Sequence, residues 1–158
     1  MQSKGPAGDC HAPRVELASV QDLATIRALL ERSGLPTSDL ESARPEFAVI
    51  REEGQVVAAG ALQRFGSSAL LRSVVVAPDH RRTGLGQAIV SELERVARAA
   101  HVGRLVLLTQ TAADFFARQG YGVIERSTAP QNMQASEEFR FLCPSSATCM
   151  AKNLTDSA

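Results

Sequence analysis

The sequence predicts a single α/β domain with a mixed, mostly antiparallel sheet and helices on both faces. Two observations carry this prediction: segments of strand length alternate with segments of helical periodicity, and three long strand-like segments follow one another across turn signals. The 158 residues, 44% of them hydrophobic, suffice for one well-buried core, and no internal repeat is present. We expect this domain over 14–152, between a polar tail at 1–13 and a short tail at 153–158.

The first expected elements are a short strand over 14–18 and an amphipathic helix. Ser19 stands three residues before Asp22, which is a variant of the capping box that opens helices. Apolar residues then recur at helical spacing until Gly34, where the helix can end because glycine readily adopts the left-handed conformation. Pro36 follows as a second stop signal.

Three strands are expected next, after a polar segment at 37–44 that predicts a short helix or loop. Apolar and β-branched residues fill these strands, and turn signals such as Glu53-Gly54 separate them. Connections this short favour an antiparallel meander. The expected strands are 46–51, 55–65 and 69–76.

Helices and strands are expected to alternate in the C-terminal half. The segment 84–100 carries one apolar face, and 104–108 is continuously apolar, as is typical of a strand buried on both faces. Thr111 and Asp114 have the spacing of a second capping box, which would open a helix over 112–119. The remaining segments are an expected strand at 121–124, an irregular polar stretch at 125–138 and a final strand at 147–152.

The composition argues against several classes of function. The 17 Lys+Arg balance 17 Asp+Glu, so bulk attraction to nucleic acid or anionic lipid is not expected. With no Trp, one Tyr and six Phe, aromatic platforms for single-stranded nucleic acid are scarce. No apolar run approaches the roughly 18 residues of a membrane span, and the polar N-terminus lacks a signal-peptide core. We therefore expect a cytoplasmic protein with free thiols and without membrane partners.

The loop before the helix at 84–100 has the features of a phosphate site. It reads His80-Arg81-Arg82-Thr83-Gly84-Leu85-Gly86. A helix N-terminus offers unpaired N–H groups and a positive dipole end, and the two glycines remove side chains that would keep an anion away. Its spacing matches neither a P-loop nor the dinucleotide fingerprint. Taken alone, Arg-x-x-Gly-x-Gly also fits a flexible loop with solvated arginines.

The surrounding sequence resembles the GCN5-related N-acetyltransferase (GNAT) superfamily. The run 73–88, Ser-Val-Val-Val-Ala-Pro-Asp-His-Arg-Arg-Thr-Gly-Leu-Gly-Gln-Ala, is similar to motif A of that superfamily, and 113–121 resembles its motif B. The resemblance covers roughly 14–152. It implies a sheet of six or seven strands, splayed between the fourth and fifth, and an enzyme that transfers acetyl from acetyl-CoA to an amine.

The resemblance also implies which residues bind acetyl-CoA. Backbone groups at the end of the fourth strand would bond the pantetheine arm, and loop amides would bond the pyrophosphate. A polar residue after the fifth strand and an aromatic residue of motif B would lie beside the same arm. The implied residues are Val74, Val75, Val76, Arg81, Arg82, Thr83, Gly84, Leu85, Gly86, Gln87, Thr109 and Phe116.

Acetyl transfer requires a donor for the oxyanion and a proton for the departing thiolate. An N–H of the splayed strand near Val74 or Val75 is the expected oxyanion donor. Many members of the superfamily carry a Tyr at the position of Phe116 to protonate the thiolate, and phenylalanine has no proton to give. Thr109, Thr111 and water are the substitutes that remain.

Arg72 is the candidate residue for binding the acceptor. Strand alternation predicts that it shares a face with Leu70, Val74 and Val76 and not with Ser73. A charged residue among apolar neighbours is costly unless it is paired. Two interpretations stay open: an ion pair with a carboxylate such as Glu46, or a clamp for an acceptor carboxylate or other oxyanion.

Three segments resemble, more narrowly, the arsenic-resistance N-acetyltransferases, which are similar to the acetyltransferase domain of N-acetylglutamate synthases. These segments are 70–76, 107–116 and 141–150. The resemblance implies a small amino acid acceptor, either glutamate or an arsenic- or phosphorus-containing analogue whose toxicity acetylation would block. Glu137 and Glu138 are candidate bases for the amine, or part of a solvated face.

Other functions remain open from the sequence. The acceptor of the same chemistry could be a polyamine, an antibiotic or a protein N-terminus, and the absent Tyr makes a non-catalytic acyl-CoA sensor conceivable. Cys143 and Cys149 could capture trivalent arsenic as a thiol pair, or pack as small hydrophobic residues. The spacing of His, Cys and acidic residues predicts no metal site. The resemblance is compatible with a homodimer formed through the terminal strands.

Overall fold

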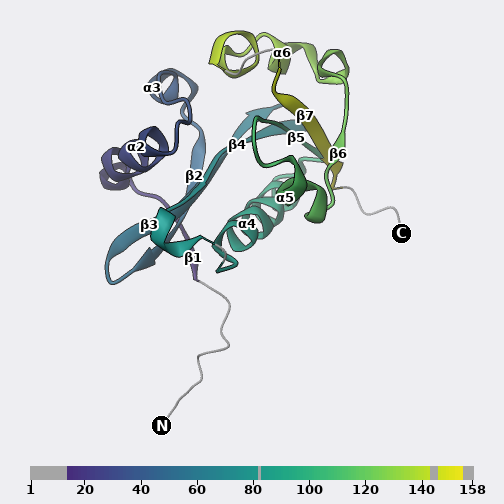
Figure 1. The fold of residues 1–158 in the computed structure, drawn as a ribbon. Coiled ribbons are helices and arrows are strands. Elements are labelled where there is room, and N and C mark those ends of the chain that lie inside the picture. The colour runs from purple at the N-terminus through teal and green to yellow at the C-terminus, as the bar shows by residue number, and fades with distance from the viewer. Residues whose placement is uncertain (1–13, 82, 143–145, 155–158) are drawn as a thin grey trace.

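The computed structural model describes residues 14–81, 83–142 and 146–154. These residues form one seven-stranded mixed sheet in the order β1-β2-β3-β4-β5-β7-β6, with helices on both faces (Figure 1). The predicted fold class is therefore confirmed. The strands are β1 (Val15–Leu17), β2 (Glu46–Glu52), β3 (Gln55–Phe65), β4 (Ser68–Val76), β5 (Arg104–Thr109), β6 (Gly122–Val123) and β7 (Thr148–Asn153). The helices are α2 (Leu23–Arg32), α3 (Leu40–Ala43), α4 (Leu85–Ala99), α5 (Ala113–Arg118) and α6 (Gln131–Gln134), with short helical turns η1 (Val20–Asp22), η2 (Pro78–His80), η3 (Arg126–Thr128) and η4 (Glu138–Leu142).

The strands β2 to β4 form the expected antiparallel meander, and β1 pairs antiparallel with β2. The next strand, β5, runs parallel to β4, and the two pair only from Ser68–Arg104 to Leu70–Val106. Beyond these pairs the strands diverge, while β5 continues to pair with β7 along its whole length. The splay that the resemblance implied between the fourth and fifth strands is present.

A β-bulge in β4 changes which side chains share a face. Arg72 pairs with Ala61 and Val75 with Ala59, so two residues of β4, Ser73 and Val74, lie between these pairs where β3 has one. Ser73 adopts a φ of 59°, which is rare for a residue with a side chain. After the bulge, Val74 and Val76 pack in the core beneath α4, while Val75 packs beneath α2.

Arg72 and Val74 therefore do not share a face. The guanidinium of Arg72 reaches Asp39, which precedes α3 on the α2 side of the sheet. The predicted common face of Arg72 with Val74 and Val76 is wrong, because regular alternation holds only in a strand without an inserted residue.

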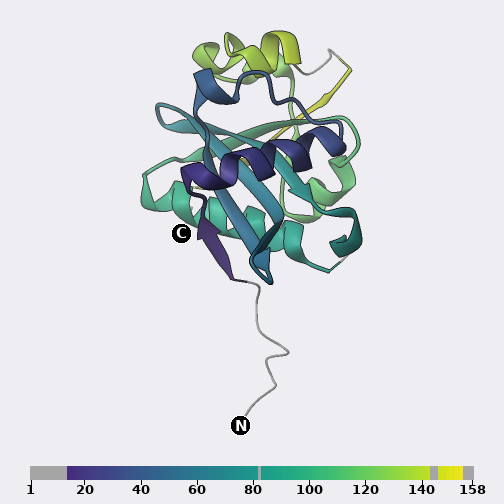
Figure 2. The same cartoon turned by 90° about the vertical axis from the view of Figure 1, so that its left-hand side faces the viewer.

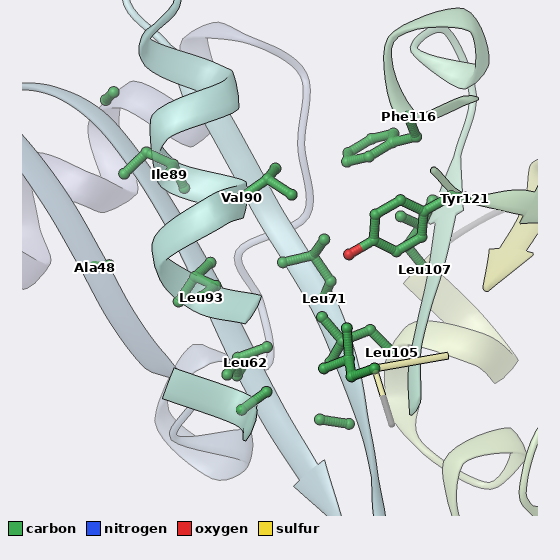
Figure 3. Packing of buried hydrophobic residues seen from close by; sticks show 14 of the residues in the cluster. Ala48, Leu62, Leu71, Ile89, Val90, Leu93, Leu105, Leu107, Phe116 and Tyr121 are labelled. Atoms are coloured by element: carbon green, nitrogen blue, oxygen red, sulfur yellow. The ribbon is translucent and has the colours of Figure 1, made fainter. Parts of the chain in front are cut away.

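Helix α4 lies closely against the sheet opposite α2 (Figure 2). A Cβ atom on Gly60 of β3 would lie 2.5 Å from Ile89 Cγ2, so glycine allows the helix its close approach. Figure 3 shows side chains of α4 packed over residues of β4 and β5, with Phe116 and Tyr121 beside them. This packing fixes where the N-terminus of α4 lies.

Local details differ from the sequence-based expectation. The first capping box is present, since Asp22 Oδ2 accepts the N–H of Ser19 at 2.8 Å. The second is not, because the N-cap of α5 is Ala112, whose N–H is instead bonded by Thr109 Oγ1 at 3.0 Å. The stretch expected to be irregular contains α6 and buries Met133.

The C-terminal strand β7 continues to Asn153, one residue beyond the expected domain end, and the following Leu154 is buried. The tail expected at 1–13 lies outside the described residues. Across the described ranges, no helix combines the length and apolar character needed to cross a bilayer.

Candidate functional site

The divergence of β4 and β5 opens a cleft of about 800 Å³. Its walls come from the ends of both strands, the first turn of α4, the helix α5, the loop after α2 and Glu138. Among the predicted site residues, the cleft is lined by Arg72, Val74, Val75, Val76, Arg81, Gly84, Gly86, Gln87, Thr109, Thr111 and Phe116. Thr83 and Leu85 belong to the same loop and helix without lining the cleft, and Arg82 lies outside the described residues.

The N-terminus of α4 presents backbone amides beside this cleft. Gly84 is the N-cap, with a φ of 85° that glycine adopts without strain. The first intrahelical bond runs from the N–H of Ala88 to the carbonyl of Gly84 at 3.1 Å, so the amides of 85–87 precede the helical ladder. Such amides, together with the helix dipole, suit an anion. Leu85 buries its side chain in the core and so anchors this first turn.

The two motifs of the resemblance meet at Gly86. A Cβ atom there would lie 3.3 Å from Cζ of Phe115, which lines the cleft from α5. Phe115 was not predicted as a site residue. The neighbouring Phe116 is buried in the core and meets Phe115 and Tyr121 edge to face, with ring centroids 5.0 and 5.8 Å apart.

Arg81 connects the loop to two neighbouring elements. Its Nε donates to the carbonyl of Val76 at 3.1 Å, and its Nη2 donates to Ser33 Oγ at 3.3 Å, just after α2. Gly34, the residue after Ser33, also lines the cleft. Arg81 therefore links the end of β4 with the wall formed by the loop after α2.

Arg72 is fully buried and surrounded by oxygen atoms. Nη1 and Nη2 donate to the two carboxylate oxygens of Asp39, each at 2.6 Å. Nη1 also donates to Gln63 Oε1 at 3.0 Å, and Nε donates to Ser73 Oγ at 3.3 Å. Nη2 lies 3.3 Å from Glu138 Oε1. All three nitrogens of the guanidinium therefore have oxygen partners.

Of the two interpretations of Arg72, the structure contains the ion pair, although its partners differ from the expected one. Glu46 instead pairs with Arg64, at 2.7 Å. Asp39 and Glu138 were not predicted as partners, because they lie far from Arg72 in the sequence and reach it only through the packing of α3 and η4. The clamp for an acceptor carboxylate stays a prediction.

The two candidate bases differ in their surroundings. Glu137 is exposed and accepts a hydrogen bond from Ser42 Oγ at 3.1 Å. Glu138 is buried, with 4% of its surface exposed, and lines the cleft. The solvated-face interpretation therefore fits Glu137 alone.

Tyr121 does not line the cleft. Its hydroxyl donates to Glu94 Oε2 at 3.0 Å in the core, where Lys152 Nζ also bonds Glu94. Burial and the neighbouring Glu94 charge raise the pKa of Tyr121 above its ordinary value. The single tyrosine of the chain is thus bonded within the core and does not line the cleft.

Cys149 is buried in β7 beside Met133 and Phe139, and burial raises the pKa of its thiol. This environment fits the packing interpretation, while Cys143 lies outside the described residues. Within the described ranges, no group of three or more His, Cys, Asp or Glu side chains could hold a metal ion.

Comparison with known proteins gives consistent matches. A family model described as an acetyltransferase (GNAT) domain matches residues 43–123. The amino-acid acetyltransferase of Edwardsiella ictaluri is 26% identical over 133 residues, which are 78% of this chain and 30% of that protein. That of Pasteurella multocida is 23% identical over 129 residues. The chain thus spans about 30% of the length of these curated relatives.

Solved structures share the fold. The N-acetylglutamate synthase of Neisseria gonorrhoeae, complexed with coenzyme A and N-acetyl-glutamate, matches with a TM-score of 0.79 at 19% identity, over 98% of this chain and 38% of that one. The protein Rv2747 of Mycobacterium tuberculosis, solved in complex with CoA, matches with a TM-score of 0.78 at 29% identity, over 90% of this chain and 100% of that one.

Proposed function

The chain belongs to the acetyltransferase (GNAT) family, and we propose that it transfers the acetyl group of acetyl-CoA to the amine of a small, amino-acid-like acceptor. The observation that carries the proposal is the cleft between β4 and β5. One cavity holds the edge of β4 beyond its pairs with β5, the amides of a helix N-terminus and a buried polar cluster. The strand edge is suited to the extended arm of the thioester, and the helix amides are suited to its pyrophosphate. The polar cluster is suited to a polar acceptor.

The residues of the cleft fit coenzyme A. Acetyl-CoA supplies the acetyl thioester, and the chain binds and orients it. The edge of β4 at 74–76, which faces the splay, would bond the pantetheine amides as an added strand would. The amides of 85–87 would hold the pyrophosphate, with Arg81 of the same loop adding positive charge.

The bulge in β4 supports an oxyanion donor at Val74. Because Ser73 has a positive φ, the peptide N–H that follows it is turned out of the regular pairing with β3. We assign this N–H of Val74 to the developing negative charge on the acetyl oxygen. A backbone donor in this role needs no reorganisation during transfer.

Thr109 is the proposed proton donor for the thiolate, with Thr111 as its neighbour in the cleft. Thr109 Oγ1 already accepts the N–H of Ala112, so its own hydrogen is available for donation. Thr109→Val is expected to lower kcat about tenfold or more, with Thr109→Ser close to wild type. Steady-state kinetics would test this, and an unchanged kcat in Thr109→Val would leave Thr111 or water as the proton donor.

An amino acid acceptor is supported by the relatives, which are named amino-acid acetyltransferases. The resemblance to arsenic-resistance enzymes narrows the proposal to glutamate or to its arsenic- or phosphorus-containing analogues, with a role in detoxification. Acetylation would remove the charge of the amine in each case. A small acceptor of this type suits the enclosed polar end of the cleft at Arg72 and Glu138.

The test is a coenzyme A release assay with a panel of amines. The panel contains glutamate, phosphinothricin and its arsenic analogue, together with spermidine and a peptide with a free N-terminus. We expect the three amino acids to have the highest kcat/KM. Higher values of kcat/KM for spermidine or the peptide would instead assign the acceptor to the polyamines or to protein N-termini. Absence of turnover with every amine, despite binding of acetyl-CoA, would refute the proposed acetyltransferase activity and favour a non-catalytic acyl-CoA sensor.

A further inference from the structure

We infer that Glu138 binds the ammonium group of the acceptor, and that Arg72 positions Glu138 without clamping an acceptor carboxylate itself. This inference rests on the proposed function and assigns the specificity-determining residue of the same cleft.

The donors of Arg72 are already engaged. A guanidinium offers its N–H groups in a fixed planar arrangement, and every nitrogen of Arg72 has a partner on Asp39, Gln63 or Ser73. The side chain has no exposed surface. An acceptor carboxylate would have to displace one of these bonds, and breaking a buried ion pair is costly. The geometry thus favours a positioning role for Arg72.

Glu138 is the charged member of this cluster that suits contact with the acceptor. Its side chain is 6% exposed, it lines the cleft, and Oε1 lies 3.3 Å from Arg72 Nη2. Nε of the same guanidinium bonds Ser73, the residue before the proposed oxyanion donor Val74. One planar group therefore contacts both Glu138 and the β4 bulge, which places the carboxylate near the site of transfer.

The negative charge of the Glu138 carboxylate favours a cationic group of the acceptor. Arg72 pairs with two carboxylates, those of Asp39 and Glu138. An aliphatic amine is largely protonated at neutral pH and reaches the cleft as a cation. A buried carboxylate forms a strong charge-assisted hydrogen bond with such a group. After acetylation the amide carries no charge, so the same carboxylate holds the product less tightly than the acceptor.

Glu137 provides a matched control, because it is the same residue type one position earlier but is exposed. We would compare Glu138→Gln with Glu137→Gln using the amine of highest kcat/KM in the panel and its deamino analogue, for example L-glutamate and glutarate. Binding of each ligand is measured by calorimetry in the presence of coenzyme A. The KM for acetyl-CoA reports whether each variant keeps an intact cosubstrate site.

Glu138→Gln is expected to weaken binding of the amine about tenfold or more and to leave the deamino analogue within about twofold. Glu137→Gln is expected to change neither. Equal weakening of both ligands would assign Glu138 a structural role and overturn the inference, as would an unchanged affinity for the amine. Absence of turnover by the wild type with every amine would instead refute the proposed function itself.

Arg72→Lys separates positioning from clamping. Lysine keeps the positive charge but lacks the planar fork. If Arg72 acts through Glu138, this variant weakens binding of the amine more than binding of its deamino analogue. If Arg72 binds an acceptor carboxylate directly, binding of both ligands weakens to the same extent, because both carry that carboxylate. The inference then fails.

Discussion

Gly84 and Gly54 have similar backbone conformations, with φ values of 85° and 79°, but only Gly84 lies at the cleft. A Cβ atom at either position would meet no atom within 4 Å. Alanine at each site is therefore expected to destabilise the fold by about 1 kcal/mol through backbone strain alone. Urea unfolding would measure this loss.

The two variants are expected to differ in catalysis. Gly84→Ala should raise the KM for acetyl-CoA, because strain at the N-cap shifts the amides of 85–87 and the added methyl group occupies the space beside them. Gly54→Ala, in the turn between β2 and β3, should leave this KM unchanged. A similar KM in both variants would mean that the N-terminus of α4 does not hold the pyrophosphate.

Removal of the hydroxyl oxygen of Tyr121 tests whether this residue acts in stability or in catalysis. Tyr121→Phe deletes the hydroxyl that donates to Glu94, and the buried carboxylate then keeps Lys152 as its partner. Loss of such a bond is expected to cost about 1–3 kcal/mol of unfolding free energy, with kcat unchanged because the side chain does not line the cleft. A variant with normal stability and a low kcat would instead identify Tyr121 as the missing proton donor.

At the scale of elements, the strands and helices follow from local sequence patterns, whereas the details at the site do not. The meander and α4 were predictable because periodicity and turn residues report the local conformation. The bulge at Ser73 was not, since Ser73-Val74 reads as ordinary strand and the inserted residue is visible only in the register with β3.

The partners of Arg72 show the same limit. Asp39 lies 33 residues before Arg72 and Glu138 lies in a polar stretch without strand or helix periodicity. A charged residue in an apolar strand predicts some buried partner, but the choice depends on how separate elements pack. The loop before α4, which lines the cleft, could be singled out from sequence because its glycines and helix start are contiguous.

The contact of α4 with β3 gives a prediction about this element. Because a Cβ atom on Gly60 would lie 2.5 Å from Ile89 Cγ2, Gly60→Ala must displace the helix or the side chain. We expect a loss of about 1–3 kcal/mol in unfolding free energy and a raised KM for acetyl-CoA, since the N-terminus of α4 moves with the helix.

Gly122 in β6 is the control for this substitution, because a Cβ atom there would meet nothing within 4 Å. Gly122→Ala is expected to leave both the unfolding free energy and the KM close to wild type. If Gly60→Ala lowered stability without changing the KM, the position of α4 would not determine cosubstrate binding.

At the scale of the whole molecule, the N-terminal segment is held to the sheet by a charged contact far from the cleft. Asp22 accepts two hydrogen bonds from Arg51 of β2, each at 2.7 Å, and another from the N–H of Ser19. The bonds from Arg51 are the largest cause that lowers the pKa of Asp22 well below its ordinary value. Folding therefore favours the ionised carboxylate.

This shift predicts how stability depends on pH. Because the folded pKa of Asp22 is lowered, the contribution is present above the pKa of the unfolded chain, near 4, and is lost as the pH falls toward the folded value. Asp22→Asn should be less stable than wild type at pH 7, and the two urea midpoints should converge as the pH falls from about 5 to 2. Arg51→Gln should behave similarly, since it removes the cause of the shift. Parallel midpoints at all pH values would mean that Asp22 titrates alike in the folded and unfolded chain, and that the contact does not hold the N-terminal segment through its charge.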